Sequence, residues 1–207
     1  GQVDFTGTIT DSMANMLNGD ESAISTAFAA VTNGTSSSDG DGGVAVTVNA
    51  GTLTVTKLNL IKAATTGQIT AAISGTANAL TSLNTVGTDA ITMTVDAGTV
   101  AAADLATIDG KTNVAVAANA VTKITGSGTE VLAALTADTN GTLVIDGDFN
   151  TDVSGDLTVA NAKTIAQATT GTVDFTGTIT DAALTFAAEN GTIEANFTAV
   201  RDGGGDG

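Results

Sequence analysis

The feature that most constrains this chain is a short sequence that it contains twice. Residues 1–11 read GQVDFTGTITD and residues 171–181 read GTVDFTGTITD, so ten of eleven positions are identical. Self-similarity at a fixed offset is typical of repeat proteins, in which each unit packs on its neighbours. We therefore predict that residues 1–170 form one repeat unit and that residues 171–207 begin the next.

Weaker similarities extend this pattern. Residues 23–34 align with residues 192–203, and both stretches run into sequence rich in Asp and Gly. Within the unit, residues 60–83 resemble residues 164–187, with a weaker third member at residues 107–128. The three members begin at residues 60, 107 and 164, so their uneven spacing predicts an irregular internal repeat.

The composition favours a core made of many small contacts. The chain contains 40 Thr, 36 Ala and 25 Gly, but only six Phe and no Trp, Tyr, Pro, His or Cys. Hydrophobic residues make up 42% of it, which argues against disorder. Because most of these side chains are small, we expect stacked layers that bury one another.

Local patterns predict short strands and short helices. Apolar residues alternate with small or polar ones, as in half-buried strands, at residues 51–60, 90–98, 113–121 and 141–149. Helical spacing occurs at residues 76–83, 100–108 and 129–137, and at residues 12–31 with an interruption at Gly19. Such short helices must dock on the strands to be stable. We predict an all-β fold, a β-solenoid with short helical corners built from irregular internal repeats; the alternative is a set of tandem β-sandwich domains.

The charge balance excludes several classes of partner. Six basic residues stand against 22 acidic ones, a net charge of −16, whereas nucleic-acid binding needs clustered Lys and Arg. No apolar run is long enough to cross a bilayer, which predicts no membrane span. The start of the chain has no charged segment followed by an apolar one, so the sequence predicts no secretory signal.

The chain lacks the residue types that most enzymes use. Without His or Cys, the commonest general bases, thiol nucleophiles and zinc ligands are absent. The four glutamates are isolated in sequence, and no phosphate-binding or dinucleotide-binding motif occurs. The prediction is that this protein is not an enzyme, and no catalytic residue is assigned.

One acidic segment predicts a metal site. The sequence DGDFNTDVSGD at residues 146–156 offers oxygen ligands of the type that Ca²⁺ prefers, on Asp146, Asp148, Asn150, Asp152 and Asp156. It departs from the EF-hand pattern, because Thr151 and Leu157 stand where a glycine and a glutamate belong. Shorter Asp/Gly stretches occur at residues 38–43 and 201–207. The alternative is that these segments are solvated turns.

Threonines recur at every second position in three stretches, TGTIT, TLTVT and TMT. Such rows would place hydroxyl groups on one face of a strand, where they could order water, bind ice or bind glycans. The simpler interpretation is that threonine forms strands well and is tolerated on a solvated face.

The sequence AADLATIDGKTNVAVAANAVTKITGSGTEVLAAL, at residues 102–135, resembles repeats of giant surface and secreted proteins of marine bacteria. The similarity covers roughly residues 60–181 and is greatest to cell-surface proteins of marine unicellular cyanobacteria, including those tied to swimming motility. Many proteins of this kind leave the cell by type I secretion, often beside calcium-binding Asp/Gly nonapeptides. The resemblance implies an extracellular or cell-surface location and a role without catalysis.

Together these observations predict a structural repeat segment of an extracellular surface protein, acting as a rod-like scaffold, an adhesin stalk or a filament. Its partners would be neighbouring repeats or other copies of the same protein. Two alternatives stay open. One is a self-assembling subunit of a surface layer, filament or phage fibre, and the other is a solenoid that binds ice or glycans.

Overall fold

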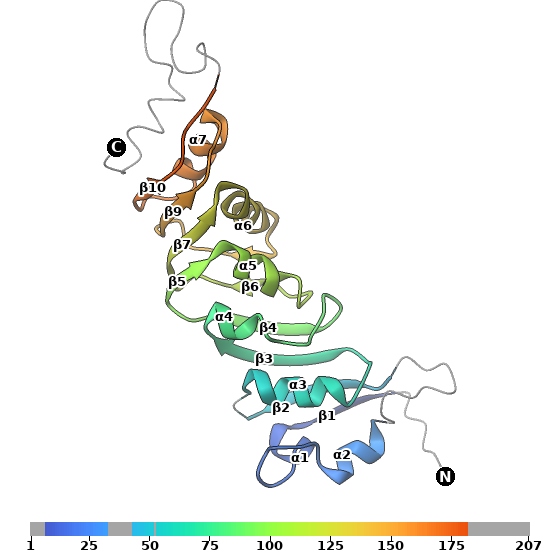
Figure 1. Cartoon of the computed structure of the whole chain (residues 1–207). Helices are drawn as coiled ribbons and strands as arrows, with labels where there is room; N and C mark the ends of the chain where they lie inside the picture. The colour runs from blue at the N-terminus through green and yellow to red at the C-terminus, as the bar shows by residue number, and fades with distance from the viewer. Residues whose placement is uncertain (1–6, 33–42, 52, 182–207) are drawn as a thin grey trace, which may run out of the picture. The chain divides into compact units, whose positions relative to one another are not determined.

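The computed structural model describes residues 7–32, 43–51 and 53–181 (Figure 1). These residues form seven helices and ten strands, and the strands make two parallel sheets. The prediction of an all-β fold, whether a β-solenoid or tandem β-sandwiches, is therefore wrong. The fold is mixed α/β, because helices connect most of the parallel strands.

The larger sheet has six strands in the order β1-β2-β3-β4-β6-β8, and the smaller has four in the order β10-β9-β7-β5. The strands of the larger sheet are β1 (Thr8–Ser12), β2 (Ala45–Ala50), β3 (Ile69–Gly75), β4 (Ala90–Val95), β6 (Val116–Ala117) and β8 (Leu143–Val144). Those of the smaller sheet are β5 (Gly98–Ala101), β7 (Val121–Ser127), β9 (Asn150–Ser154) and β10 (Val173–Phe175). The helices are α1 (Met13–Met16), α2 (Thr26–Val31), α3 (Val55–Ala63), α4 (Ala77–Leu80), α5 (Ala102–Asp109), α6 (Gly128–Asn140) and α7 (Val159–Gln167).

A hydroxyl group begins most of these helices. Ser25, Thr54, Thr76, Ser127 and Thr158 each precede a helix, and each side chain accepts a hydrogen bond from the backbone N–H three residues later. This contact satisfies one of the backbone donors that a helix leaves unpaired at its start. The abundant Ser and Thr therefore set where helices begin as well as filling strands.

Residues 51–60 show why the all-β prediction failed. The alternation in TLTVTKLNL predicts a strand, yet α3 begins at Val55 after the Thr54 cap. Leu58 and Ile61 are fully buried and lie three residues apart, which is helical spacing. This sequence fits both the period of a strand and the period of a helix. Burial of the helical face, at Leu58 and Ile61, favours the helix. The helix α7 was missed by the sequence analysis.

The chain divides into two compact units. The first comprises residues 1–94 and 108–117, and the second comprises residues 95–107 and 118–207. These boundaries differ from the repeat boundary predicted at residue 170, and the predicted second repeat lies mostly outside the described residues.

In the first unit, one face of the sheet carries the core and the other faces solvent. Side chains of β3 and β4 alternate between buried and exposed along both strands. The buried face packs on helices through fully buried Leu58, Ile61, Ile69, Leu80 and Ile91. Parallel sheets usually bury both faces, whereas the outward positions here hold small residues such as Thr70, Ala72 and Ser74 that tolerate water.

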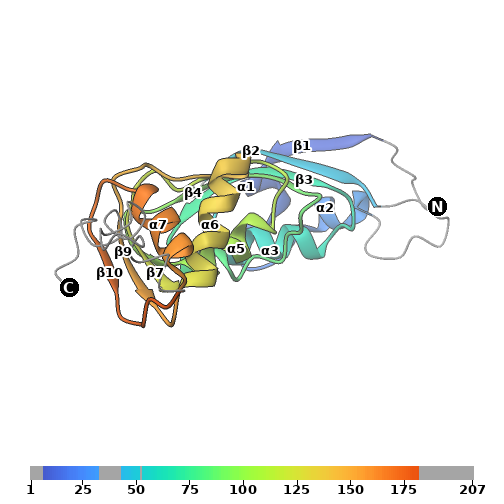
Figure 2. The same cartoon turned by 90° about the horizontal axis from the view of Figure 1, so that it is seen from above.

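In the second unit, α6 lies against β7 and α7 (Figure 2). Its core contains Ile124, Val131, Phe149, Val153 and Ile165, all of them 0% or 1% exposed. The strands pair in parallel, with Ile124 opposite Thr151 and Thr151 opposite Val173. The chain between paired residues is long enough to hold one connecting helix, as a parallel crossover requires.

A threonine after a helix ties successive strands together at three places. The hydroxyl groups of these post-helix threonines, Thr65, Thr112 and Thr169, donate to the carbonyl oxygens of Val44, Ile91 and Phe149, respectively. Each hydroxyl also accepts a hydrogen bond from the backbone N–H two residues later. Thr65 and Thr112 are buried, so these links satisfy backbone groups that water cannot reach.

Candidate functional site

The structure places the predicted calcium ligands on β9 and the turns on either side of it. Asp146 accepts a hydrogen bond from the Asn119 side chain at 3.0 Å. Asn150 accepts from both the backbone N–H and the hydroxyl group of Thr172, at 2.8 Å each. Both residues therefore hold neighbouring segments through side-chain oxygens.

The acidic residues Asp152 and Asp156 have partners of their own. Asp152 forms an ion pair with Lys123 at 2.6 Å, and the Asp156 carboxylate accepts a hydrogen bond from the backbone N–H of Thr178 at 2.9 Å. Asp148 is exposed in the turn before β9. Three of the five predicted ligands thus accept hydrogen bonds and a fourth has a basic partner, each involving a different neighbouring residue.

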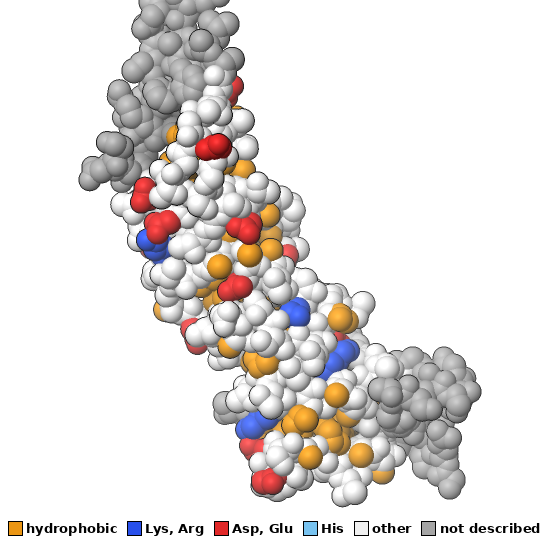
Figure 3. Space-filling view, viewed as in Figure 1, with side chains coloured by type: hydrophobic (Ala, Val, Ile, Leu, Met, Phe, Trp, Pro, Cys, Tyr) orange, Lys and Arg blue, Asp and Glu red, His pale blue; other side chains and the backbone are white. Residues whose placement is uncertain are grey.

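Within the described residues, no group of three or more acidic side chains is placed to hold a metal ion. On the face drawn in Figure 3, the acidic side chains lie as separate groups among mostly uncharged ones. The calcium site stays a prediction, since no metal is part of the structure. The Asp/Gly stretches at residues 38–43 and 201–207 lie outside the described residues, apart from Gly43.

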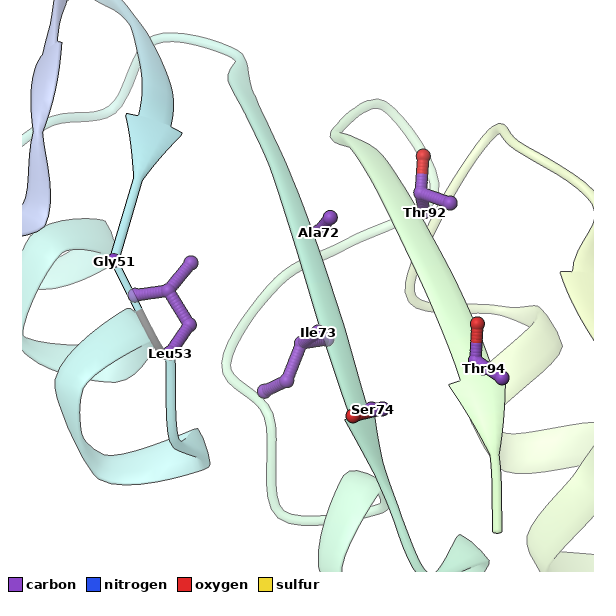
Figure 4. A pocket seen from close by; sticks show the side chains of 7 residues that line it. All are labelled: Gly51, Leu53, Ala72, Ile73, Ser74, Thr92 and Thr94. Carbon is purple, nitrogen blue, oxygen red and sulfur yellow. The ribbon is translucent and has the colours of Figure 1, made fainter.

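A hollow of about 260 Å³ lies in the first unit beside the exposed face of β3 and β4 (Figure 4). Its lining residues are Gly51, Leu53, Ala72, Ile73, Ser74, Thr92 and Thr94. None of them is titratable, so the hollow offers hydroxyl groups and methyl groups without an acid, a base or a charged nucleophile.

Two of the three predicted threonine rows lie on strands. Thr8 and Thr10 are exposed on β1, and Thr92 and Thr94 are exposed on β4. The register places Thr10 opposite Thr47, and Thr47 opposite Thr70, so one row of hydroxyl-bearing residues crosses three strands. The third row, TLTVT, does not form a strand in its described residues, because it includes the Thr54 cap and the first two residues of α3.

The first unit contains a buried acidic residue, Asp89, whose carboxylate is held by hydrogen bonds and an ion pair. Asp89 is fully buried, and its carboxylate accepts hydrogen bonds from the backbone N–H groups of Ile69 and Val86 at 2.8 and 2.9 Å. It also forms an ion pair with Lys62 at 2.9 Å. These contacts of the carboxylate join one segment of the unit to another, and the sequence analysis did not identify them.

The repeated sequence marks a further candidate site, because the chain contains it twice. The first copy contributes β1, which lies at one end of the larger sheet, and the second contributes β10, which lies at one end of the smaller sheet. In the described parts of the two copies, GTITD at residues 7–11 corresponds to GTITD at residues 177–181. We call these two segments the first and second GTITD strands; the second follows β10 and is joined to its neighbour by a single parallel bridge, between Ile179 and Leu157.

The two GTITD strands pair through opposite edges. In the second, the Thr178 carbonyl accepts a hydrogen bond from the Leu157 N–H at 3.0 Å, and the Thr180 N–H donates to the Leu157 carbonyl at 2.8 Å. In the first, Ile9 lies opposite Val46 of β2. The Val46 N–H donates to the Gln68 carbonyl on its other side, at 2.9 Å, so Val46 faces β3. Because successive residues of a strand face opposite neighbours, Ile9 and Asp11 face β2, while Thr8 and Thr10 face outward.

Comparison with known proteins gives no match: no family model, no curated protein and no solved structure is significantly similar to this chain. The resemblance to bacterial surface-protein repeats therefore stays a prediction from the sequence. Among the described residues, no helix has the length and apolar character that crossing a bilayer requires. This finding agrees with the prediction that the chain has no membrane span.

Proposed function

We propose that this chain is a structural repeat segment of an extracellular surface protein, and that its copies continue into one another through the GTITD strands. The observation that carries the proposal is the pairing of these two identical strands. One is seen with its following neighbour, β2, and the other with its preceding neighbour, Leu157. A chain that repeats this unit would give every such strand both neighbours.

The chemistry of the described residues favours a non-catalytic role. The hollow beside β3 and β4 contains no titratable group, and the buried pair of Asp89 and Lys62 is engaged in holding segments together. Most catalytic sites combine a cleft with a perturbed acid, base or nucleophile. A scaffold needs repeated backbone pairing and buried polar groups that are mostly paired. Among the described residues, the buried side chains of Asp89, Thr65 and Thr112 have partners, whereas the buried hydroxyl groups of Thr85 and Thr151 have none.

The sequence resemblance supports a location outside the cell, and the composition is compatible with it. A net charge of −16 keeps neighbouring chains apart through repulsion, and the absence of cysteine makes folding independent of the redox compartment. The sequence resemblance points to bacterial surface proteins of great length. We assign the segment the role of a stalk or filament element, whose partners are neighbouring repeats of the same protein.

A tandem protein tests this proposal. Residues 1–170 are followed directly by residues 1–207, so that the second copy of residues 7–11 replaces the GTITD strand at residues 177–181. In repeat proteins, a formed interface adds to the stability of the units on both sides. We therefore expect a higher midpoint of urea unfolding for the tandem protein than for the single chain, with one cooperative transition.

A matched pair of substitutions controls the test. A Cβ atom at Gly177 would lie 2.0 Å from the Gly155 carbonyl oxygen, whereas a Cβ at Gly7 would meet no described atom within 4 Å. Gly7→Ala in the second, internal copy should therefore remove the gain in stability, and Gly7→Ala in the first copy should leave it intact. If the tandem protein melts like two single chains joined by a Gly/Ser linker, the repeats do not continue into one another.

A further inference from the structure

The outer edge of β1 presents backbone groups in a defined pattern. Thr8 and Thr10 face away from β2, as derived above, and no described strand pairs with this edge. Both side chains are exposed, and Ile9 is only half-buried, whereas Val46 and Ile69 in the same row of the sheet are 1% and 0% exposed. Unpaired strand edges are templates for adding another strand.

The second GTITD strand shows which segment fits such an edge. Its Thr178 and Thr180, the counterparts of Thr8 and Thr10, share two backbone hydrogen bonds with Leu157. The Thr178 N–H also donates to the Asp156 carboxylate. The edge that β1 leaves open is therefore the same edge, with the same sequence, that pairs with Asp156 and Leu157 in the second copy.

Gly7 gives independent support. Nothing described around Gly7 requires a glycine, because an added Cβ would contact no atom and the backbone does not adopt a positive φ. At Gly177 an added Cβ would lie 2.0 Å from the Gly155 oxygen, so only glycine fits. A glycine at position 7 becomes a requirement as soon as a segment like Gly155–Leu157 lies against β1.

We propose that the outer edge of β1 docks onto the segment Gly155–Thr158 of a second copy of this chain, forming a head-to-tail contact between copies. Within one chain, that segment already pairs with the second GTITD strand. Docking therefore exchanges one GTITD strand for an identical one, and the intact second strand acts as a competitor. The inference goes beyond the proposed function, because it concerns separate chains and the tandem test can succeed without it.

The experiment displaces the second GTITD strand from the segment Gly155–Thr158 in the full chain. Gly177→Ala places a Cβ against the Gly155 oxygen and should displace the second GTITD strand. The freed segment is then open to Gly7–Thr10 of another copy. We expect the weight-average mass, measured by sedimentation equilibrium from micromolar to sub-millimolar protein, to rise from the monomer value of 20.1 kDa to at least twice that value. The unsubstituted chain should stay nearer to the monomer over the same range.

The matched control blocks the other partner of the contact. Gly7→Ala with Gly177→Ala should return the mass to the monomer value, because neither GTITD strand then fits the Gly155 carbonyl. Gly7→Ala alone should leave the circular dichroism spectrum and melting of the single chain unchanged. A folded Gly177→Ala chain that stays monomeric, or a double variant that associates as strongly as the single one, would overturn the proposal.

A second pair of substitutions covers the case in which Gly177→Ala does not fold. Thr180→Pro removes the N–H that donates to Leu157 at 2.8 Å, and it lies on an exposed residue. Thr10→Pro removes the equivalent outward N–H of β1, a position at which an edge strand tolerates proline. Association of the Thr180→Pro chain that Thr10→Pro abolishes supports the contact, and the absence of association refutes it.

Discussion

At the residue scale, threonine performs three different tasks in this protein. It caps helices at positions such as Thr54, it faces solvent on strands at positions such as Thr70, and it links successive strands at Thr65, Thr112 and Thr169. The sequence analysis recognised only the strand task. Because all three use the same side chain, counting threonines predicts strand content and misses the helix starts and the buried links.

The buried link at Thr65 should contribute measurably to stability. Thr65→Val keeps the shape of the side chain but leaves the Val44 carbonyl and the Gly67 N–H without their partner, at 2.5 and 3.0 Å in the structure. Stranding a buried polar group costs about 1–3 kcal/mol. We expect a loss of that size in the free energy of urea unfolding. Thr66→Val, at the exposed neighbouring position, should change the free energy of unfolding by less than about 0.5 kcal/mol. Equal losses in the two variants would show that the hydrogen bonds of Thr65 do not contribute to stability.

Residue chemistry also shows why the sequence does not decide between a metal site and a polar strand face. Asp, Asn and Asp at alternate positions are equally suited to a calcium loop and to a polar strand face, and spacing does not separate the two. The structure gives Asn150, Asp152 and Asp156 different neighbours, at Thr172, Lys123 and Thr178. Those neighbours belong to other segments, distant along the chain, so no local motif could have identified them.

At the element scale, some elements were predicted from local patterns and others were not. Helices predicted at residues 100–108 and 129–137 correspond to α5 and α6, and the strand predicted at 90–98 contains β4. The predicted strands at 113–121 and 141–149 contain the two-residue strands β6 and β8 and, at Val121, the first residue of β7. The missed elements are no shorter than these, since α3 and α7 have nine residues each and β3 and β7 have seven each. Packing against neighbours decides the type of such elements.

The capping box of α6 predicts a pH dependence. The Glu130 carboxylate accepts hydrogen bonds from the backbone N–H and hydroxyl group of Ser127 at 2.8 and 2.9 Å, and these donors lower its pKa below the usual 4.5, the backbone N–H contributing most. A carboxylate with a lower pKa in the folded state stabilises the fold above its unfolded pKa. That contribution is lost as the pH falls from about 4.5 through the folded value.

Glu130→Gln isolates this effect. The free energy of unfolding, measured by urea titration between neutral and acidic pH, should fall less steeply below about 4.5 in the variant than in the parent chain. Ser127→Ala should lower stability by about 1 kcal/mol already at neutral pH, since it removes the cap itself. Identical pH profiles for the parent and Glu130→Gln chains would show that the capping box does not contribute.

At the scale of the whole molecule, the recurrence could be recognised in the sequence and the class of fold could not. The first GTITD strand lies in β1, at one end of the larger sheet, and the second directly follows β10, at one end of the smaller sheet. The fold class was wrong because small apolar residues fit helices and strands equally well, and alanine in particular favours helices. The segment that covers the second GTITD strand is identified by the hydrogen bonds of Leu157, which no sequence pattern contains.

The prediction that calcium stabilises the fold can be tested on the whole chain. The sequence prediction is that chelation lowers the melting temperature, because bound calcium would couple folding to the external ion. Thermal melts followed by far-UV circular dichroism should then differ between EDTA and millimolar calcium. Asp148→Asn changes one exposed member of the predicted set and should reduce the difference. Coincident melts in the two solutions would remove calcium from the description of this protein.

The spacing of the paired strands has a consequence for a protein under tension. Val46 pairs with Ile69, and Thr94 with Ala117, so each pairing encloses a single crossover. Peeling one such strand from its sheet frees the helix or loop behind it, about 75–80 Å of chain when fully extended. The remaining strands keep their own partners, so length is released in small portions. A tether made of many such units would yield gradually to a sudden pull and shorten again as each strand re-forms.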